Sequence, residues 1–183
     1  MHFYLPIYVV IISLISCQNQ AELKTSETLK SFIDSEIVVP TNLLRKTYCN
    51  EPIDNTLLTK SYKMIVYLNA NGCEECKLTT LLPLSQFIHE HSTYSSHFGV
   101  VIILHPTHMP EPDRFLEQIQ YRHPVFYDLD GSFERLNPHL PQDERFHTFL
   151  LDKNNKVVVV GNPVHNEKLK KLYLKALNQY PYQ

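Results

Sequence analysis

The fold is decided by the stretch MIVYLNANGCEECK, residues 64–77. Its first five residues are all apolar, which is typical of a strand that is covered on both faces. Residues 69–72 read as a turn, and the Cys-x-x-Cys pair Cys73 and Cys76 follows at once. From Lys77 to about residue 91, apolar side chains recur at helical spacing, and Pro83 is expected to kink the helix. The stretch therefore predicts a buried strand, a tight turn and a helix that begins beside two thiols.

The segments on either side predict one α/β domain with a mixed sheet. Upstream, we expect a short helix over 26–35 and an irregular segment or weak hairpin over 41–61. Downstream, we expect strands over 98–104, 123–128, 145–151 and 156–161, helices over 113–121 and 167–178, and about one helical turn over 133–136. The two strands separated by the first helix should pair in parallel, because a crossover helix joins them. The last two strands are joined by residues 152–155 and should form an antiparallel hairpin.

This order of elements, with a Cys-x-x-Cys pair opening the first helix, resembles the thioredoxin fold. Residues 148–157, TFLLDKNNKV, are similar to the strand–turn–strand of the TlpA-like thiol-disulfide oxidoreductases, and residues 127–133, YDLDGSF, are similar to their D-x-x-G segment. The resemblance covers about residues 63–177. It implies a three-layer α/β/α sandwich with a mixed central sheet, placed here at residues 61–180. It also implies thiol-disulfide exchange with other proteins.

The two thiols suit that chemistry. The thiolate is the nucleophile in disulfide exchange, and the positive end of a helix lowers the pKa of a cysteine placed there. Cys73 is therefore predicted to attack first, as the more exposed thiol, and Cys76 to resolve the mixed disulfide from the more buried side. The spacing of three residues puts both sulfurs on one helix face, within reach of a disulfide. Gly72 allows a partner backbone to approach closely.

Several residues depart from the family pattern. Glu74 and Glu75 lie between the cysteines, and their carboxylates oppose thiolate formation, so we predict a reducing or weakly poised pair. The chain has no tryptophan, although family members usually carry one just before the first cysteine. The place of the usual cis-proline falls to Phe146, where a trans peptide is expected. Phe146 and His147 are the candidates for lining the site beside the thiols.

Two alternatives to redox chemistry stay open. The thiols with a nearby histidine such as His147 could bind copper(I) or zinc, or the pair could be a retained disulfide in a binding module that is not an enzyme. Cys49 is interpreted as a structural or adventitious thiol, with a role as a third redox partner left open. No cofactor is expected. The net charge of −2 and the lack of a basic run argue against nucleic acid as a partner.

The N-terminus reads as an export signal, with a short transmembrane anchor or a buried strand as the alternatives. Residues 3–15, FYLPIYVVIISLI, form an apolar run that is shorter than the roughly 20 residues of a membrane-spanning helix. Residues 14–17, LISC, resemble a bacterial lipobox, in which Cys17 would carry the lipid. We therefore expect a lipoprotein signal over 1–17, a tether and extension over 18–60, and a domain anchored in the cell envelope facing the periplasm. Its partners would be the thiols or disulfides of envelope proteins.

Overall fold

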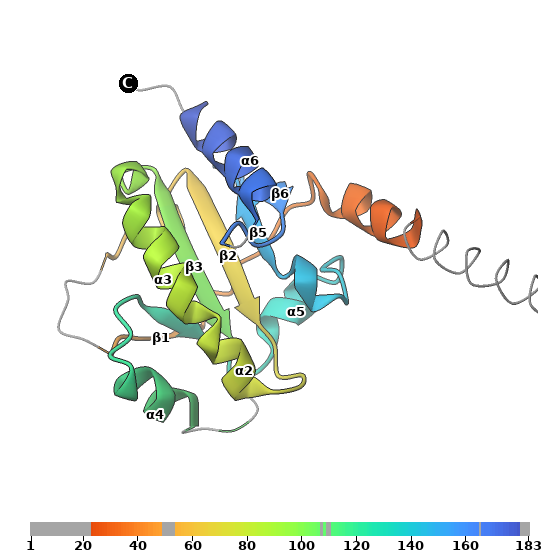
Figure 1. Cartoon of the computed structure of the whole chain (residues 1–183). Helices are drawn as coiled ribbons and strands as arrows, with labels where there is room; N and C mark the ends of the chain where they lie inside the picture. The colour runs from red at the N-terminus through yellow and green to blue at the C-terminus, as the bar shows by residue number, and fades with distance from the viewer. Residues whose placement is uncertain (1–22, 49–53, 107, 109–110, 165, 180–183) are drawn as a thin grey trace, which may run out of the picture.

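A six-stranded mixed sheet organises the chain (Figure 1). The computed structural model describes residues 23–48, 54–106, 108, 111–164 and 166–179. The strand order is β1-β4-β3-β2-β5-β6. The strands are β1 (Leu44–Lys46), β2 (Tyr62–Leu68), β3 (Phe98–Leu104), β4 (Val125–Tyr127), β5 (Thr148–Leu151) and β6 (Val157–Val160). Strands β2, β3 and β4 run parallel, while β1, β5 and β6 pair antiparallel with their neighbours, so the predicted mixed sheet is confirmed.

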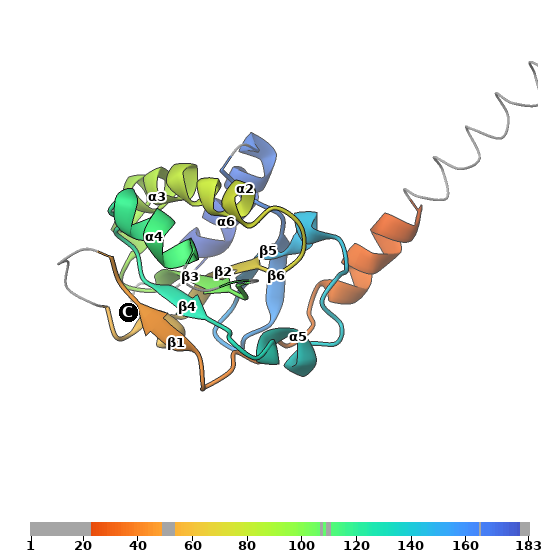
Figure 2. The same cartoon turned by 90° about the horizontal axis from the view of Figure 1, so that it is seen from below.

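Helices cover both faces of this sheet. They are α2 (Glu74–Thr79), α3 (Leu81–Glu90), α4 (Glu111–Gln118), α5 (Ser132–Leu136) and α6 (Glu167–Asn178), and residues 23–32 are also helical. Figure 2 shows α2, α3, α4 and α6 on one side of the sheet and α5 on the other. Within the described residues, no helix is both long enough and apolar enough to span a bilayer.

The strands β2 and β3 supply both halves of the core. Alternate side chains such as Met64 and Val66 pack with α2, α3, α4 and α6, and the intervening Ile65 and Tyr67 pack on the other face with α5 and Phe32. Six of the seven β2 residues and all of β3 are buried, as the uninterrupted apolar runs predict. The central strands are therefore fixed by burial on two sides, and the loop at the end of β2 starts from a rigid base.

The helix after the cysteine pair is broken where proline predicts a break. It begins at Glu74, three residues earlier than Lys77, and α2 gives way to α3 at Thr80. Pro83 has no N–H to donate to the carbonyl of Thr79, so one helical hydrogen bond is missing there. The Thr80 hydroxyl donates to the Lys77 carbonyl at 2.6 Å, an added bond of the kind that bends helices. The predicted kink is confirmed.

Three expectations need correction. Residues 44–46 form the edge strand β1, paired with β4, where an irregular segment or weak hairpin was expected. Residues 144–146 form a short 3-10 helix, and β5 begins only at Thr148, not at residue 145. The helix expected over 113–121 is α4, which begins at Glu111 and ends at Gln118, and Gln120 has a left-handed backbone.

Candidate active site

Cys73 and Cys76 form a disulfide at the start of α2. Their Cα atoms lie 5.3 Å apart, and Cys73 is the N-cap residue of the helix. The Cys73 sulfur accepts a hydrogen bond from the Cys76 backbone N–H at 3.2 Å. This is the contact by which the first turn of a helix stabilises negative charge on a sulfur. Both cysteines are exposed, so the expected burial of Cys76 relative to Cys73 is not seen in this oxidised form.

The turn before the pair depends on two residues. Gly72 is exposed and has φ +74°, a conformation that residues with a Cβ adopt at a cost, and no atom lies within 4 Å of where a Cβ would be. Asn69 is 6% exposed, and its side-chain oxygen accepts from the Asn71 N–H at 3.3 Å. Gly72 therefore bends the chain toward Cys73, while Asn69 holds the turn from inside.

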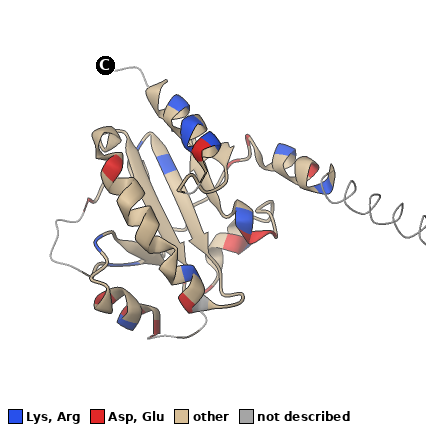
Figure 3. Ribbon diagram, viewed as in Figure 1, with Lys and Arg blue, Asp and Glu red and all other residues tan. Residues whose placement is uncertain are grey.

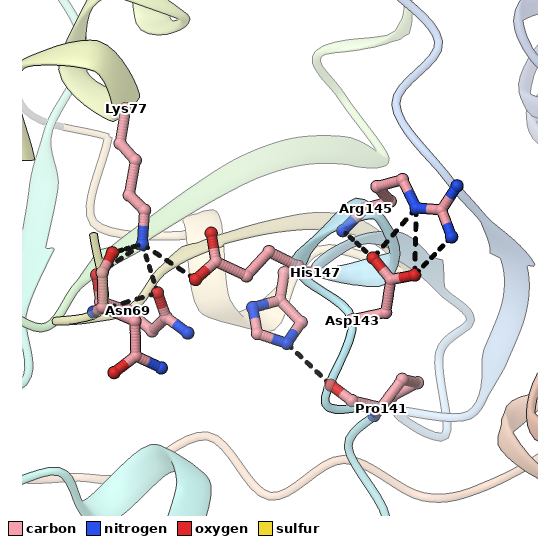
Figure 4. Close-up of polar contacts among 8 residues, drawn as sticks. Asn69, Lys77, Pro141, Asp143, Arg145 and His147 are labelled. Atoms are coloured by element: carbon pink, nitrogen blue, oxygen red, sulfur yellow. Dashed lines mark hydrogen bonds and ion pairs between the residues drawn. The ribbon is translucent and has the colours of Figure 1, made fainter. Parts of the chain in front are cut away.

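Lys77 ties this turn to the loop that precedes β5 (Figure 4). Its ammonium donates to the backbone carbonyl of Asn69 at 3.1 Å, to the Asn69 side-chain oxygen and to the carbonyl of Asn71. It also forms an ion pair with Glu144 at 3.1 Å. One cation thus joins α2, the turn and the 3-10 helix before β5, although Glu144 lies 67 residues further along the chain.

The loop before β5 holds His147 in the interior. His147 is 4% exposed, and its Nε2 donates to the Pro141 carbonyl at 2.8 Å, as Figure 4 shows. Its ring lies 5.4 Å from that of Tyr67, centroid to centroid. Burial lowers the pKa of His147, because desolvation disfavours the imidazolium. The side chain is therefore held as the neutral tautomer protonated on Nε2.

A cavity of about 190 Å³ lies between the turn, α2 and this loop. Asn69, Lys77, Glu144 and His147 are among its lining residues. Phe146 is half-buried and stacks beneath the guanidinium of Arg145, 5.6 Å from the ring centroid. Of the two predicted candidates from this loop, His147 thus reaches the cavity, whereas Phe146 packs against its neighbour.

The remaining predicted site residues fall in two groups. Glu75 is exposed on the first turn of α2, and Glu74 is the first residue of that helix. Cys17, Cys49 and the expected signal over 1–17 lie outside the described residues. Within the part of the chain that the structure describes, no group of three or more His, Cys, Asp or Glu side chains could hold a metal ion.

Solved structures of other proteins share the fold of this chain. One is a candidate thiol:disulfide interchange protein, DsbE, from Chlorobium tepidum, with a TM-score of 0.55 and 20% identity over 79% of this chain and 99% of that one. The fold is thioredoxin-like. A thiol:disulfide interchange protein from Bacteroides sp. matches this thioredoxin-like domain with a TM-score of 0.52 and 12% identity, covering 82% of this chain and 93% of that one. No protein-family model and no curated protein matches the sequence.

The sequence did not single out three residues of this thioredoxin-like site: Asn69, Lys77 and Glu144. The spacing does indicate Lys77 as a site residue, because a residue four positions after Cys73 lies on the same helix face. No spacing indicates Glu144, since it is far away in sequence and meets Lys77 only through the pairing of β5 with β2.

Proposed function

We propose that this chain is a thiol-disulfide exchange protein that works through Cys73 and Cys76. The observation that carries the proposal is the exposed disulfide at a helix N-terminus, at the end of a central buried strand of a thioredoxin-like fold. Exposure lets a partner reach the sulfurs, and the hydrogen bond from the Cys76 N–H supports a thiolate on Cys73.

In the reducing direction, the Cys73 thiolate attacks one sulfur of a partner's disulfide. A mixed disulfide forms, and the partner's other sulfur leaves as a thiolate, which takes up a proton. The Cys76 thiol then loses its proton and attacks the Cys73 sulfur, which closes the Cys73–Cys76 disulfide and releases the partner's second thiolate. The partner gains two electrons and two protons, and the dithiol of this chain loses them. The reverse sequence oxidises a partner dithiol.

We propose that the Cys73–Cys76 couple is reducing or weakly poised, and not a strong oxidant. A strong oxidant needs a reduced form that is stabilised by a low thiol pKa. Glu75 is exposed beside Cys76, and its carboxylate opposes the effect of the helix on the sulfurs; Glu74, which precedes it in the sequence, is expected to add to this.

The proposed place of action is the bacterial cell envelope. The apolar run and the lipobox-like residues 14–17 support an anchor on Cys17, which would leave the residues between Cys17 and the helix at 23–32 to connect the membrane to the domain. The partners would then be envelope proteins with exchangeable disulfides or thiols.

Turnover by the full-length chain in detergent micelles tests the proposal. The chain is reduced, mixed with insulin or oxidised glutathione, and the loss of its thiols is followed, in a Cys49→Ser background that removes one confounding thiol. Exchange that needs both cysteines is expected, so Cys73→Ser and Cys76→Ser should each abolish turnover. No turnover by the parent chain, together with a Cys73→Ser chain that behaves like it, would instead favour a binding module.

A further inference from the structure

Lys77 is held more tightly than an ordinary surface lysine. Only 16% of its side chain is exposed, and its ammonium contacts oxygens of Asn69, Asn71 and Glu144. Lysines on a helix surface usually keep their rotamer freedom and contribute little through single ion pairs. Three of the four acceptors of Lys77 are oxygens of Asn69 and Asn71, in the turn that leads into Cys73. The fourth is the carboxylate of Glu144. The side chain is therefore anchored to the backbone of the active-site turn.

The same residue carries a charge on the face of the cysteine pair. Lys77 follows Cys76 directly, and its backbone N–H donates to the Cys73 carbonyl at 3.2 Å. Residues four apart lie one turn from each other on a helix. Figure 3 shows residues of both charge signs on α2. The sequence of this helix includes Glu74 and Glu75 as well as Lys77. The ammonium is thus the cation in this helix that opposes the two carboxylates.

We propose that Lys77 is a positioning residue that sets the redox poise of the Cys73–Cys76 pair, with Glu144 as its counter-charge. Lys77 fixes the turn and places positive charge against the residues that lead into Cys73, while Glu144 neutralises part of that charge from the loop before β5. This inference rests on the proposed function of the pair.

The charge arrangement makes two variants act in opposite directions. Lys77→Met removes the cation, so the Cys73 thiolate loses a favourable interaction and its measured pKa should rise by about one unit. Glu144→Gln keeps the shape of the side chain but leaves the ammonium without its counter-charge, so the pKa of Cys73 should fall. A role in stability alone predicts no such opposition, because both variants break the same ion pair.

Alkylation of the reduced full-length chain in detergent micelles measures this effect. The rate of iodoacetamide reaction is followed against pH at the Cys73 peptide by mass spectrometry, in the Cys49→Ser background. Lys77→Arg keeps the charge and should stay close to the parent. Lys170→Met is the matched control, because Lys170 pairs with Glu90 at 3.7 Å, at the end of α3 far from the cysteines, and should leave the profile unchanged.

A second readout is the equilibrium with glutathione. For Lys77→Met the ratio of dithiol to disulfide should fall by up to about tenfold, which is about 30 mV for a two-electron couple. Shifts of the Cys73 pKa in the same direction for Lys77→Met and Glu144→Gln, or no shift in either, would overturn the inference. A pair that fails to exchange with glutathione at all would count against the proposed function alone, since the alkylation profile needs no exchange.

Discussion

Asp128, the first residue of the D-x-x-G segment, offers a direct test of how hydrogen bonds stabilise that segment. This carboxylate is 1% exposed and caps the start of α5. One oxygen accepts from the Ser132 N–H at 2.9 Å and from the Ser132 hydroxyl at 2.8 Å, and the other accepts from the Phe133 N–H at 2.9 Å. Replacing Asp128 with alanine removes all three bonds at once.

The expected loss of stability depends on which of the three hydrogen-bond donors keeps a partner when Asp128 is replaced. The Ser132 N–H still reaches Asp130 at 3.2 Å, and its hydroxyl reaches Asn42 at 3.4 Å, whereas the Phe133 N–H is left buried and unpaired. An orphaned buried donor costs about 1–3 kcal/mol, and weakening the other two bonds adds to this, so we expect Asp128→Ala to lower the free energy of unfolding by about 2–4 kcal/mol. Ser132→Ala removes one bond and should cost about 1 kcal/mol.

Urea unfolding of the oxidised chain, followed by circular dichroism, measures both variants. With a urea slope of about 2 kcal/mol per molar, Asp128→Ala should move the midpoint down by roughly 1–2 M without changing the slope. The reasoning is refuted if Asp128→Ala is no less stable than Ser132→Ala, because the buried carboxylate would then contribute nothing beyond one hydroxyl contact.

Three further predictions concern Gly72, Gly161 and His147. Gly72→Ala should lower the free energy of unfolding in urea by about 1–2 kcal/mol, because a residue with a Cβ is strained at φ +74°. Gly72→Asn should lower it less, because Asn tolerates this conformation better, and equal losses for the two variants would contradict this. Gly161→Ala should lower the melting temperature in calorimetry more than Gly72→Ala, since its Cβ would also lie 2.7 Å from Leu169 Cδ1 at φ +113°; a smaller effect would disprove the clash. Burial lowers the pKa of His147, so the unfolded chain binds the proton more readily, and stability should fall as pH drops below 6.5. His147→Gln should flatten that dependence below about pH 6.5, and an unchanged slope there would show that other groups cause it.

The central strands and the position of the cysteine pair could be predicted because local sequence decides them. The run at 98–104 coincides with β3, and the run at 64–68 lies within β2, since a strand buried on both faces must be apolar throughout. The break in the helix followed from Pro83, whose missing N–H acts within one turn.

The edge strand β1 and the start of β5 could not be read in the same way. Leu44 to Lys46 are mostly exposed and show no alternation, so only their pairing with β4, some 80 residues away, makes them a strand. The sequence pattern predicts a strand from residue 145, yet Asp143 accepts from the Arg145 N–H at 3.0 Å and caps a 3-10 helix there. Local side-chain capping overrides strand propensity at such positions.

The residues of the site also differ in whether local sequence or long-range pairing decides their position. Cys73, Cys76 and Gly72 follow one another in the chain, and their helix-start geometry was predictable from spacing. Lys77 and Glu144 meet only once the sheet has assembled. The hydrogen bond from His147 Nε2 to the Pro141 carbonyl likewise depends on the folded loop and cannot be read from the sequence.

Trapping of a mixed disulfide tests most directly whether Cys73 is the attacking thiol. A reduced Cys76→Ser chain in the Cys49→Ser background, offered a protein with a reactive disulfide, should accumulate a covalent complex joined through Cys73, because its resolving thiol has been removed. The Cys73→Ser chain should accumulate none. A complex joined through Cys76 in the Cys73→Ser chain, together with no complex at Cys73, would contradict the assignment of roles to the two sulfurs.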